Sequence, residues 1–118
     1  MGTTNGSAAD SVAATYYDSQ DADQFYEQVW GGEDIHIGLY ATPDEAIATA
    51  SDRTVHALLE LADPLPQGGC VVDLGAGYGG ASRRLARWSE RPVHAINISA
   101  VENDRHRRLN VDAGLEHQ

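Results

Sequence analysis

The residues best suited to chemistry lie in the run VVDLGAGYGG, residues 71–80. Gly75, Gly77 and Gly80 satisfy the G-x-G-x-x-G pattern of loops that hold nucleotide cofactors. Glycine permits a tight turn and lets a ligand approach the backbone closely, because it has no Cβ atom. A strand-to-helix turn that binds nothing would satisfy the same pattern. The spacing alone therefore indicates a dinucleotide-type site and leaves a bare turn open as the alternative.

Two polar residues near this loop favour a different cofactor. Asp73 precedes the first glycine by two residues, where a carboxylate disfavours a pyrophosphate and favours a cation. Asn97 ends the second predicted strand, where dinucleotide sites carry an acid for the ribose hydroxyls. S-adenosylmethionine has no phosphate and carries an ammonium and a sulfonium, so it suits this loop better than NAD. A nicotinamide-dependent oxidoreductase remains the alternative outside the methyltransferases.

Two helices are expected before the glycine loop. Apolar residues at helical spacing predict the first from about Ser19 to Trp30, with a cap at Asp18 or Ser19 and an end at residues 31–32. Residues 42–45, Thr-Pro-Asp-Glu, form a capping-box pattern that predicts the start of the second, and Asp63-Pro64 predicts its end. Its inward face is expected to carry Ile47, Ser51, Val55, Leu58 and Ala62.

The rest of the chain alternates strands with helices. Short apolar runs predict buried parallel strands at residues 70–74 and 93–98, with a helix at 81–88 between them. Ser99 and Glu102 form a second capping box, which opens a helix to about Asp112. This order predicts a right-handed parallel α/β unit.

Three parts are expected along the chain. Residues 1–14 are predicted to be a disordered polar tail, 15–64 a helical lid segment, and 65–118 the first two βα units of a cofactor-binding domain. Two parallel strands cannot cover both faces of a sheet, and doubly wound sheets have about five or more strands. We therefore expect the N-terminal portion of a longer protein.

The charge is strongly acidic. The chain has 18 carboxylates, 8 arginines and no lysine, for a net charge of −10. This balance disfavours nucleic acid and anionic membranes as partners. An ordinary acidic soluble protein and an adaptation to high salt both explain it. The single cysteine, the lack of a signal peptide and the lack of a long apolar run favour the cytoplasm.

The motifs together resemble one group of enzymes. VVDLGAGYGG with NISAVENDRHRRLN is similar to the cofactor-binding half of class I S-adenosylmethionine-dependent methyltransferases. YYDSQDADQFYEQVWGGEDIHIGLY, taken with these motifs, resembles the sarcosine/dimethylglycine N-methyltransferases, which complete glycine betaine synthesis and so provide an osmoprotectant. The resemblance covers about residues 15–118 and implies a doubly wound Rossmann-like methyltransferase fold preceded by a helical lid.

The resemblance also implies roles for individual residues in binding S-adenosylmethionine. The methionine and ribose parts of the cofactor would lie over the glycine loop, its amino group would face a carboxylate, and the end of the second strand would hold the ribose and adenine. An N-terminal lid would close over the site. The implied cofactor-binding residues, in that order, are Gly75, Ala76, Gly77, Asp73, Asn97, Ile98, Tyr17, Trp30 and His36.

The expected reaction is methyl transfer to a small-molecule amine. The transfer is an in-line displacement in which the enzyme aligns the acceptor nitrogen and excludes water. The acceptor must lose a proton first; His36 is a candidate base, but deprotonation before binding suffices, so no catalytic residue is assigned. No metal site is expected. A sugar, phenol or lipid as the acceptor is the alternative within the class.

Overall fold

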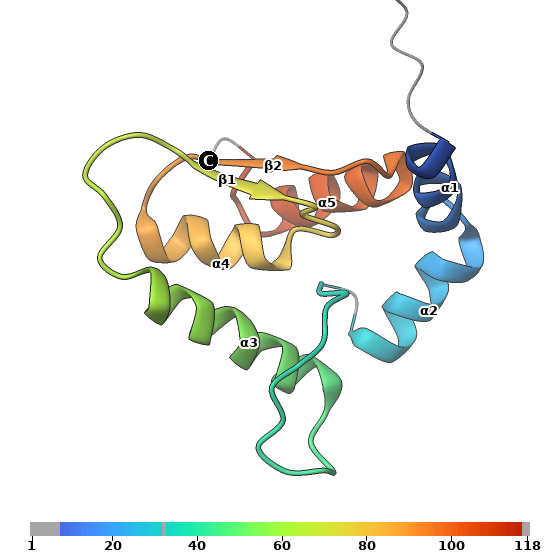
Figure 1. Cartoon of the computed structure of the whole chain (residues 1–118), viewed down its shortest axis with the longest axis horizontal. Coiled ribbons are helices and arrows are strands. Elements are labelled where there is room, and N and C mark those ends of the chain that lie inside the picture. Colours follow the sequence, from blue (N-terminus) through green and yellow to red (C-terminus); the bar gives the residue numbers. More distant parts are fainter. Residues whose placement is uncertain (1–7, 32, 117–118) are drawn as a thin grey trace, which may run out of the picture.

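The computed structural model describes residues 8–31 and 33–116. Figure 1 shows two neighbouring strands flanked by α4 and α5, with α3 beyond α4 and with α1 and α2 at the end of the molecule toward which β1 points. The elements are α1 (Ala8–Tyr17), α2 (Gln20–Trp30), α3 (Ile47–Ala62), β1 (Val71–Leu74), α4 (Gly80–Ser89), β2 (Val93–Ile96) and α5 (Ala100–Asp112).

The two strands pair in parallel, as the strand-helix-strand order predicts. Their expected burial is wrong, because the two-stranded sheet leaves one face uncovered: Val72, Leu74 and Ile96 are 52%, 76% and 55% exposed. Their register runs from Val71 opposite Val93 to Leu74 opposite Ile96. Past the last pair, the amides of Gly75 and Ala76 both donate to the carbonyl of Ile96, at 2.8 and 3.1 Å. These bonds hold the start of the glycine loop against the end of β2, the edge where open α/β sheets bind ligands.

Helix α2 begins and ends where its caps predict. Ser19 Oγ accepts a hydrogen bond from the amide of Ala22 at 3.2 Å, which satisfies a free N–H group of the first turn. Gly31 adopts a left-handed conformation with φ of 87° and donates to the carbonyl of Tyr26. The aromatic residues of this helix are grouped: the rings of Phe25, Tyr26 and Trp30 lie 5.4 to 5.5 Å apart.

The expected N-terminal tail differs from the structure over residues 8–14, which belong to α1. Alanine, the strongest helix former, occupies four of the ten positions of this helix, AADSVAATYY. Tertiary contact adds to this preference, because α1 packs against both α2 and α5. The rest of the expected tail, residues 1–7, lies outside the described residues.

The expected start of the second predicted helix is wrong by four residues. Helix α3 begins at Ile47, and its N-cap Ala46 makes no side-chain bond. Instead of capping the helix through Thr42, the Glu45 carboxylate pairs with Arg53 and accepts from the amide of Ala41 at 3.0 Å. Residues 42–45 therefore form a separate turn, closed by the Glu45 amide on the Thr42 carbonyl.

The inward face of α3 also differs from the expected one. Ser51 and Val55 are buried as expected, but the buried leucine is Leu59; Leu58 is 61% exposed, and Ala62 is exposed as well. The buried residues at 51, 55 and 59 follow an i, i+4 row, which forms one face of a helix. Helix α3 also contacts α4. Within the described residues, no helix is long and apolar enough to cross a membrane.

Candidate functional site

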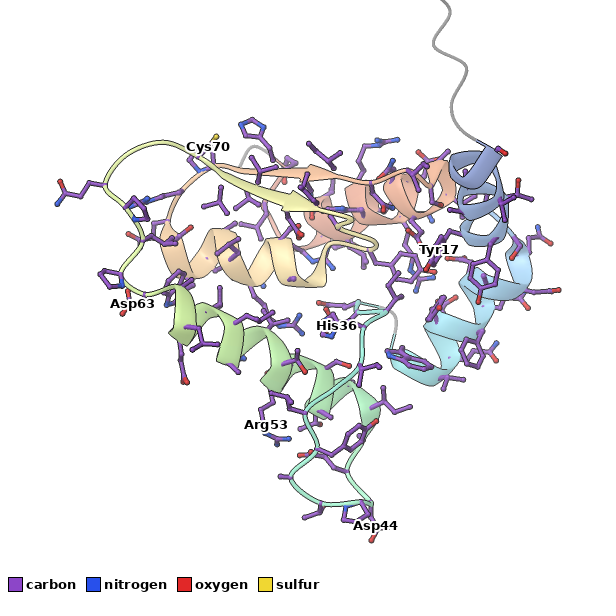
Figure 2. The ribbon with its side chains drawn as sticks, in the orientation of Figure 1. Tyr17, His36, Asp44, Arg53, Asp63 and Cys70 are labelled. Atoms are coloured by element: carbon purple, nitrogen blue, oxygen red, sulfur yellow. The ribbon has the colours of Figure 1, made fainter. Side chains whose placement is uncertain are left out.

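A pocket of about 140 Å³ lies where the segment after α2 meets the glycine loop. Its walls come from residues 33–36 on one side and from the end of β1, the glycine loop and the start of α4 on the other. Figure 2 shows His36 on this side of the molecule, below the tip of the glycine loop. The lining residues are Glu33, Asp34, Ile35, His36, Asp73, Gly75, Ala76, Tyr78, Gly80 and Ala81; we call this the acidic pocket.

Segment 33–36 is anchored to the first turn of α4. The amide of Gly80 donates to the carbonyl of Glu33 at 3.1 Å. A Cβ atom at position 80 would lie 2.5 Å from that carbonyl oxygen and 2.2 Å from Oδ1 of Asp34. Gly80 is therefore required by a contact within the protein, whereas the sequence pattern alone suggested a contact with the ligand.

An ion-pair network fixes the same segment to two helices. Nη1 of Arg84 lies 3.1 and 3.0 Å from the two carboxylate oxygens of Asp34, whose side chain is 5% exposed. Arg84 also pairs through Nε with Asp52 of α3. His36 lies on the other side of Asp34, with Nε2 3.5 Å from Oδ1. Trp30 completes the anchoring, because its indole N–H donates to the His36 carbonyl at 2.8 Å.

The glycines of the loop serve different purposes. Gly75, Gly77 and Gly79 all have positive φ angles, of 74°, 54° and 80°. A Cβ atom on Gly77 would touch the side chain of Ile35, and one on Gly79 would overlap the ring of His106. A Cβ atom on Gly75 would meet nothing within 4 Å. Among these three, only Gly75 faces open space, at the edge of the acidic pocket.

Asp73 is oriented by the helix that follows the loop. Ser82 Oγ donates to Asp73 Oδ2 at 2.6 Å, and the Asp73 side chain lines the acidic pocket. One hydrogen bond to a hydroxyl leaves the carboxylate charge uncompensated, since a carboxylate offers about four acceptor positions. This end of the pocket therefore favours a cationic group such as an ammonium.

Asn97 lies at the end of β2 and is fixed from two sides. Its Nδ2 donates to Oε2 of Glu102 at 2.6 Å, and its backbone carbonyl accepts from Nδ2 of Asn103 at 3.1 Å. Glu102 is only 2% exposed, and this burial raises the pKa of its carboxyl above the ordinary value. Of the two hydrogen bonds of the second predicted capping box, the one in which Ser99 Oγ accepts from the Glu102 amide is present, at 3.1 Å. The Glu102 carboxylate is used to hold Asn97.

The structure brings together four of the nine predicted cofactor-binding residues. Asp73, Gly75, Ala76 and His36 line the acidic pocket. The other five residues do not line this pocket. Tyr17 lies against the ring of Tyr16, and Trp30 belongs to the aromatic group of α2. Gly77 lies against Ile35, Asn97 is bonded to Glu102, and Ile98 is 51% exposed. Figure 2 shows Tyr17 near the α1–α2 junction, away from His36.

Sequence reasoning missed Tyr78, the largest fully buried side chain. Its hydroxyl donates to Asp23 Oδ1 at 2.6 Å, and burial together with this carboxylate raises the pKa of the phenol. The guanidinium of Arg105 lies 4.8 Å from the ring centre and pairs with Asp23 and Glu27 of α2. The position of Tyr78 among the glycines of the loop was the signal in the sequence that could have singled it out. The partners of Tyr78 lie far from it in the sequence.

Within residues 8–31 and 33–116, no His, Cys, Asp or Glu cluster could hold a metal ion.

The chain is similar to several known methyltransferases. No protein-family profile matches the chain. All 118 residues align at 98% identity with dimethylglycine N-methyltransferase from Parasynechococcus marenigrum (strain WH8102) and span 42% of its length. The crystal structure of a candidate sarcosine dimethylglycine methyltransferase from Galdieria sulphuraria has a TM-score of 0.68 at 44% identity, over 81% of this chain and 38% of that one. Geranyl diphosphate C-methyltransferase from Streptomyces coelicolor A3(2) has a TM-score of 0.76 at 15% identity, over 97% and 48%.

The fold is the N-terminal portion of a Rossmann-like methyltransferase fold, as expected. The resemblance to the sarcosine/dimethylglycine N-methyltransferases is confirmed by the near identity to one of them along the whole chain. The chain spans less than half the length of that relative.

Proposed function

We propose that the protein is an S-adenosylmethionine-dependent N-methyltransferase that acts on dimethylglycine, sarcosine or both, toward glycine betaine. The observation that carries the proposal is the 98% identity to dimethylglycine N-methyltransferase over all 118 residues. A cytoplasmic setting is part of this proposal, and the single cysteine is the sequence feature that supports it.

The chemistry of the acidic pocket suits the cationic end of the proposed cofactor. Gly75 leaves open space beside the backbone, and Asp73 places a carboxylate at the same edge. S-adenosylmethionine is a cation at its sulfonium and carries an ammonium, so both features favour it over a pyrophosphate. The geranyl diphosphate C-methyltransferase that shares the fold was solved with S-adenosyl-L-homocysteine bound, which supports this choice.

Residues of this chain would bind the cofactor, orient it and shield it from water. The cofactor supplies an activated methyl group on sulfur, so the protein needs to align the acceptor and keep water away. Asp73 would hold the cationic end of the cofactor. The Ile96 carbonyl fixes the amides of Gly75 and Ala76 and so sets the position of the glycine loop. Segment 33–36, anchored by Asp34 and Arg84, covers one side.

His36 lines the acidic pocket but is not assigned as the base of the reaction. Its ring lies 3.5 Å from Asp34 and faces the acidic pocket. Deprotonation of the amine before binding serves the reaction equally well, so catalytic residues stay unassigned.

Two measurements on the full-length protein test the proposal. Isothermal titration should detect binding of S-adenosylhomocysteine and none of NAD; binding of NAD alone would contradict it. In an assay with glycine, sarcosine and dimethylglycine, methyl transfer should occur to sarcosine, to dimethylglycine or to both. If neither accepts a methyl group while the cofactor still binds, the methyltransferase class stands and the acceptor assignment is wrong.

A further inference from the structure

A groove separate from the acidic pocket lies between α1 and α2. It has a volume of about 480 Å³, and its lining residues are Tyr16, Ser19, Asp21, Ala22 and Phe25; we call it the aromatic groove. None of these residues lines the acidic pocket. Figure 1 shows α1 and α2 at the end of the molecule toward which β1 points, so the aromatic groove lies at the same end as the glycine loop.

Two accessible aromatic rings line this groove. Tyr16 of α1 is 55% exposed and Phe25 of α2 is 48% exposed, so each ring offers surface to a ligand. Exposed apolar surface that is gathered in one groove marks a binding site more often than apolar residues scattered singly. Aromatic rings also present a negative face, which attracts cations.

Neighbouring aromatic residues hold both rings in place. Phe25 packs on Tyr26 and Trp30, with ring centres 5.5 and 5.4 Å apart. Tyr16 packs edge-on against Tyr17 at 5.0 Å. Burial and the hydroxyl of Tyr16 raise the pKa of Tyr26 to about 12, so Tyr16 also contacts the aromatic group of α2. Rings that are fixed before a ligand arrives lower the entropic cost of binding it.

The charge beside the rings is negative. Asp21, in the first turn of α2, lines the aromatic groove, and no lysine or arginine precedes Arg53 in the sequence. Across residues 8–31 and 33–116, no basic side chain pairs with Asp21. The helix dipole accounts for an acid in the first turn, but it does not account for two accessible rings beside that acid.

The polar group of Ser19 is already used within the protein. Its hydroxyl donates to the Tyr16 carbonyl at 2.8 Å and accepts from the Ala22 amide at 3.2 Å. An ammonium that still carries N–H groups needs acceptors for each of them, whereas a fully methylated ammonium needs none. Two rings and one carboxylate therefore suit a methylated cation better than a bare one.

We infer that the aromatic groove binds a trimethylammonium group, with the rings of Tyr16 and Phe25 against its methyl groups and the Asp21 carboxylate balancing its charge. The link to the reaction rests on the proposed function, because transfer of a methyl group to dimethylglycine gives a product with this group. The aromatic groove would then be a product-binding site separate from the acidic pocket.

Binding of tetramethylammonium to the full-length protein, measured by ligand-observed NMR, is the first test. Tyr16→Leu and Phe25→Leu each remove a ring and keep apolar volume, so each should raise the Kd about threefold to tenfold. Asp21→Asn, at an exposed position, should raise the Kd and make it less sensitive to salt. The control variants are Tyr40→Leu and Asp104→Asn, which change an exposed tyrosine and an exposed acid outside the groove and should leave the Kd unchanged.

An uncharged isostere separates a cation site from a merely apolar groove. In 3,3-dimethylbutanoate, a carbon replaces the nitrogen of glycine betaine, so the shape is kept and the positive charge is lost. The wild type should bind glycine betaine at least about tenfold more tightly than this isostere, and more tightly than glycine. Equal affinity for the two isosteres, or unchanged binding of tetramethylammonium in all three groove variants, overturns the inference.

The methyl-transfer assay keeps this result apart from the proposed function. A wild type that methylates sarcosine or dimethylglycine but binds no tetramethylammonium overturns the inference alone. A wild type that methylates neither amine, while tetramethylammonium binds and the groove variants weaken it, overturns the proposed function and supports the cation site.

Discussion

The hydroxyl of Tyr78 donates a 2.6 Å hydrogen bond to Oδ1 of Asp23, which joins the glycine loop to α2 across 55 positions of sequence. A second contact of the same kind lies nearby, where Ser99 Oγ donates to Asp18 Oδ1 at 2.6 Å. The carboxylate of Asp18 thus lies at the N-terminus of α5, where an anion is stabilised by the helix dipole, and its pKa is lowered by these bonds. These two hydrogen bonds attach the N-terminal helical segment to the glycine loop and to the start of α5.

Tyr78→Phe should loosen the attachment of α2. The change removes the hydrogen bond to Asp23 and keeps the ring that packs beside Arg105. Asp23 retains its pairing with Arg105 at 3.5 Å, so we expect a loss of about 1–2 kcal/mol in the free energy of unfolding, measured by urea denaturation. Tyr40→Phe, at a residue 48% exposed, is the matched control and should change it little. Equal stability of the two variants would contradict the assigned contact.

Asp34→Asn should destabilise the segment that covers the acidic pocket. The change leaves the partly buried Arg84 with Asp52 as its remaining carboxylate partner. Breaking a buried ion pair by removing one partner is costly, and we expect a loss of about 2–3 kcal/mol. Asp104→Asn removes the exposed pair with Arg107 and should cost about 0.5 kcal/mol or less. Thermal unfolding measures both, and a reversed order would show that the anchoring is unimportant.

The local signals in the sequence predicted α2, the two strands and their parallel pairing, but they did not predict α1 or the start of α3. Ser19 and Gly31 bound α2, and the apolar runs before Gly75 and Asn97 become β1 and β2, because these features act through nearby backbone atoms. In both predicted capping boxes, the glutamate side chain does not make the expected bond to the backbone of the N-cap residue. Glu45 binds Arg53 and Glu102 binds Asn97, in each case outside the first turn of the helix that the pattern describes.

The packing partners of the candidate site lay beyond such reasoning. The glycine pattern located the loop, but it did not separate Gly75, which faces open space, from Gly80, which lies against Asp34. That distinction depends on where residues 33–36 lie after folding, and they are more than forty positions away in the sequence. The hydrogen bonds from Tyr78 to Asp23 and from Arg84 to Asp34 likewise join residues that are far apart in the sequence and meet only after folding.

Glu45→Gln should change the response of the protein to acid. The pairing with Arg53 lowers the pKa of Glu45 to about 2, below its ordinary value of 4.5. A lowered folded-state pKa gives stability that is present above pH 4.5 and is lost as the pH falls toward 2. The difference between wild type and variant in urea midpoint should therefore be largest near neutral pH and should close over this range. A difference that stays constant with pH would contradict the ion pair; Glu60→Gln, an exposed acid on α3, controls for removal of one charge.

Gly80→Ala should destabilise the protein although alanine is the better helix former. Helix propensity alone predicts a gain of about 1 kcal/mol at this position in α4. The added Cβ atom would instead lie 2.5 Å from the Glu33 carbonyl oxygen and 2.2 Å from Asp34 Oδ1, so segment 33–36 must shift. We expect a lower melting temperature and weaker binding of S-adenosylhomocysteine in the full-length protein. A higher melting temperature would show that the segment does not lie against α4.

Gly75→Ala should weaken cofactor binding more than it weakens the fold. Gly75 and Gly69 have similar backbone angles, with φ of 74° and 77°, and a Cβ atom on either would meet nothing within 4 Å. Alanine at a positive φ costs about 1 kcal/mol through backbone strain, so Gly75→Ala and Gly69→Ala should lower the free energy of unfolding by similar amounts. Only position 75 borders the acidic pocket, and there the new methyl group occupies space assigned to the cofactor. Isothermal titration of the full-length protein should show a Kd for S-adenosylhomocysteine raised at least about tenfold in Gly75→Ala and unchanged in Gly69→Ala. Equal affinity in the two variants would mean that the cofactor does not lie against Gly75.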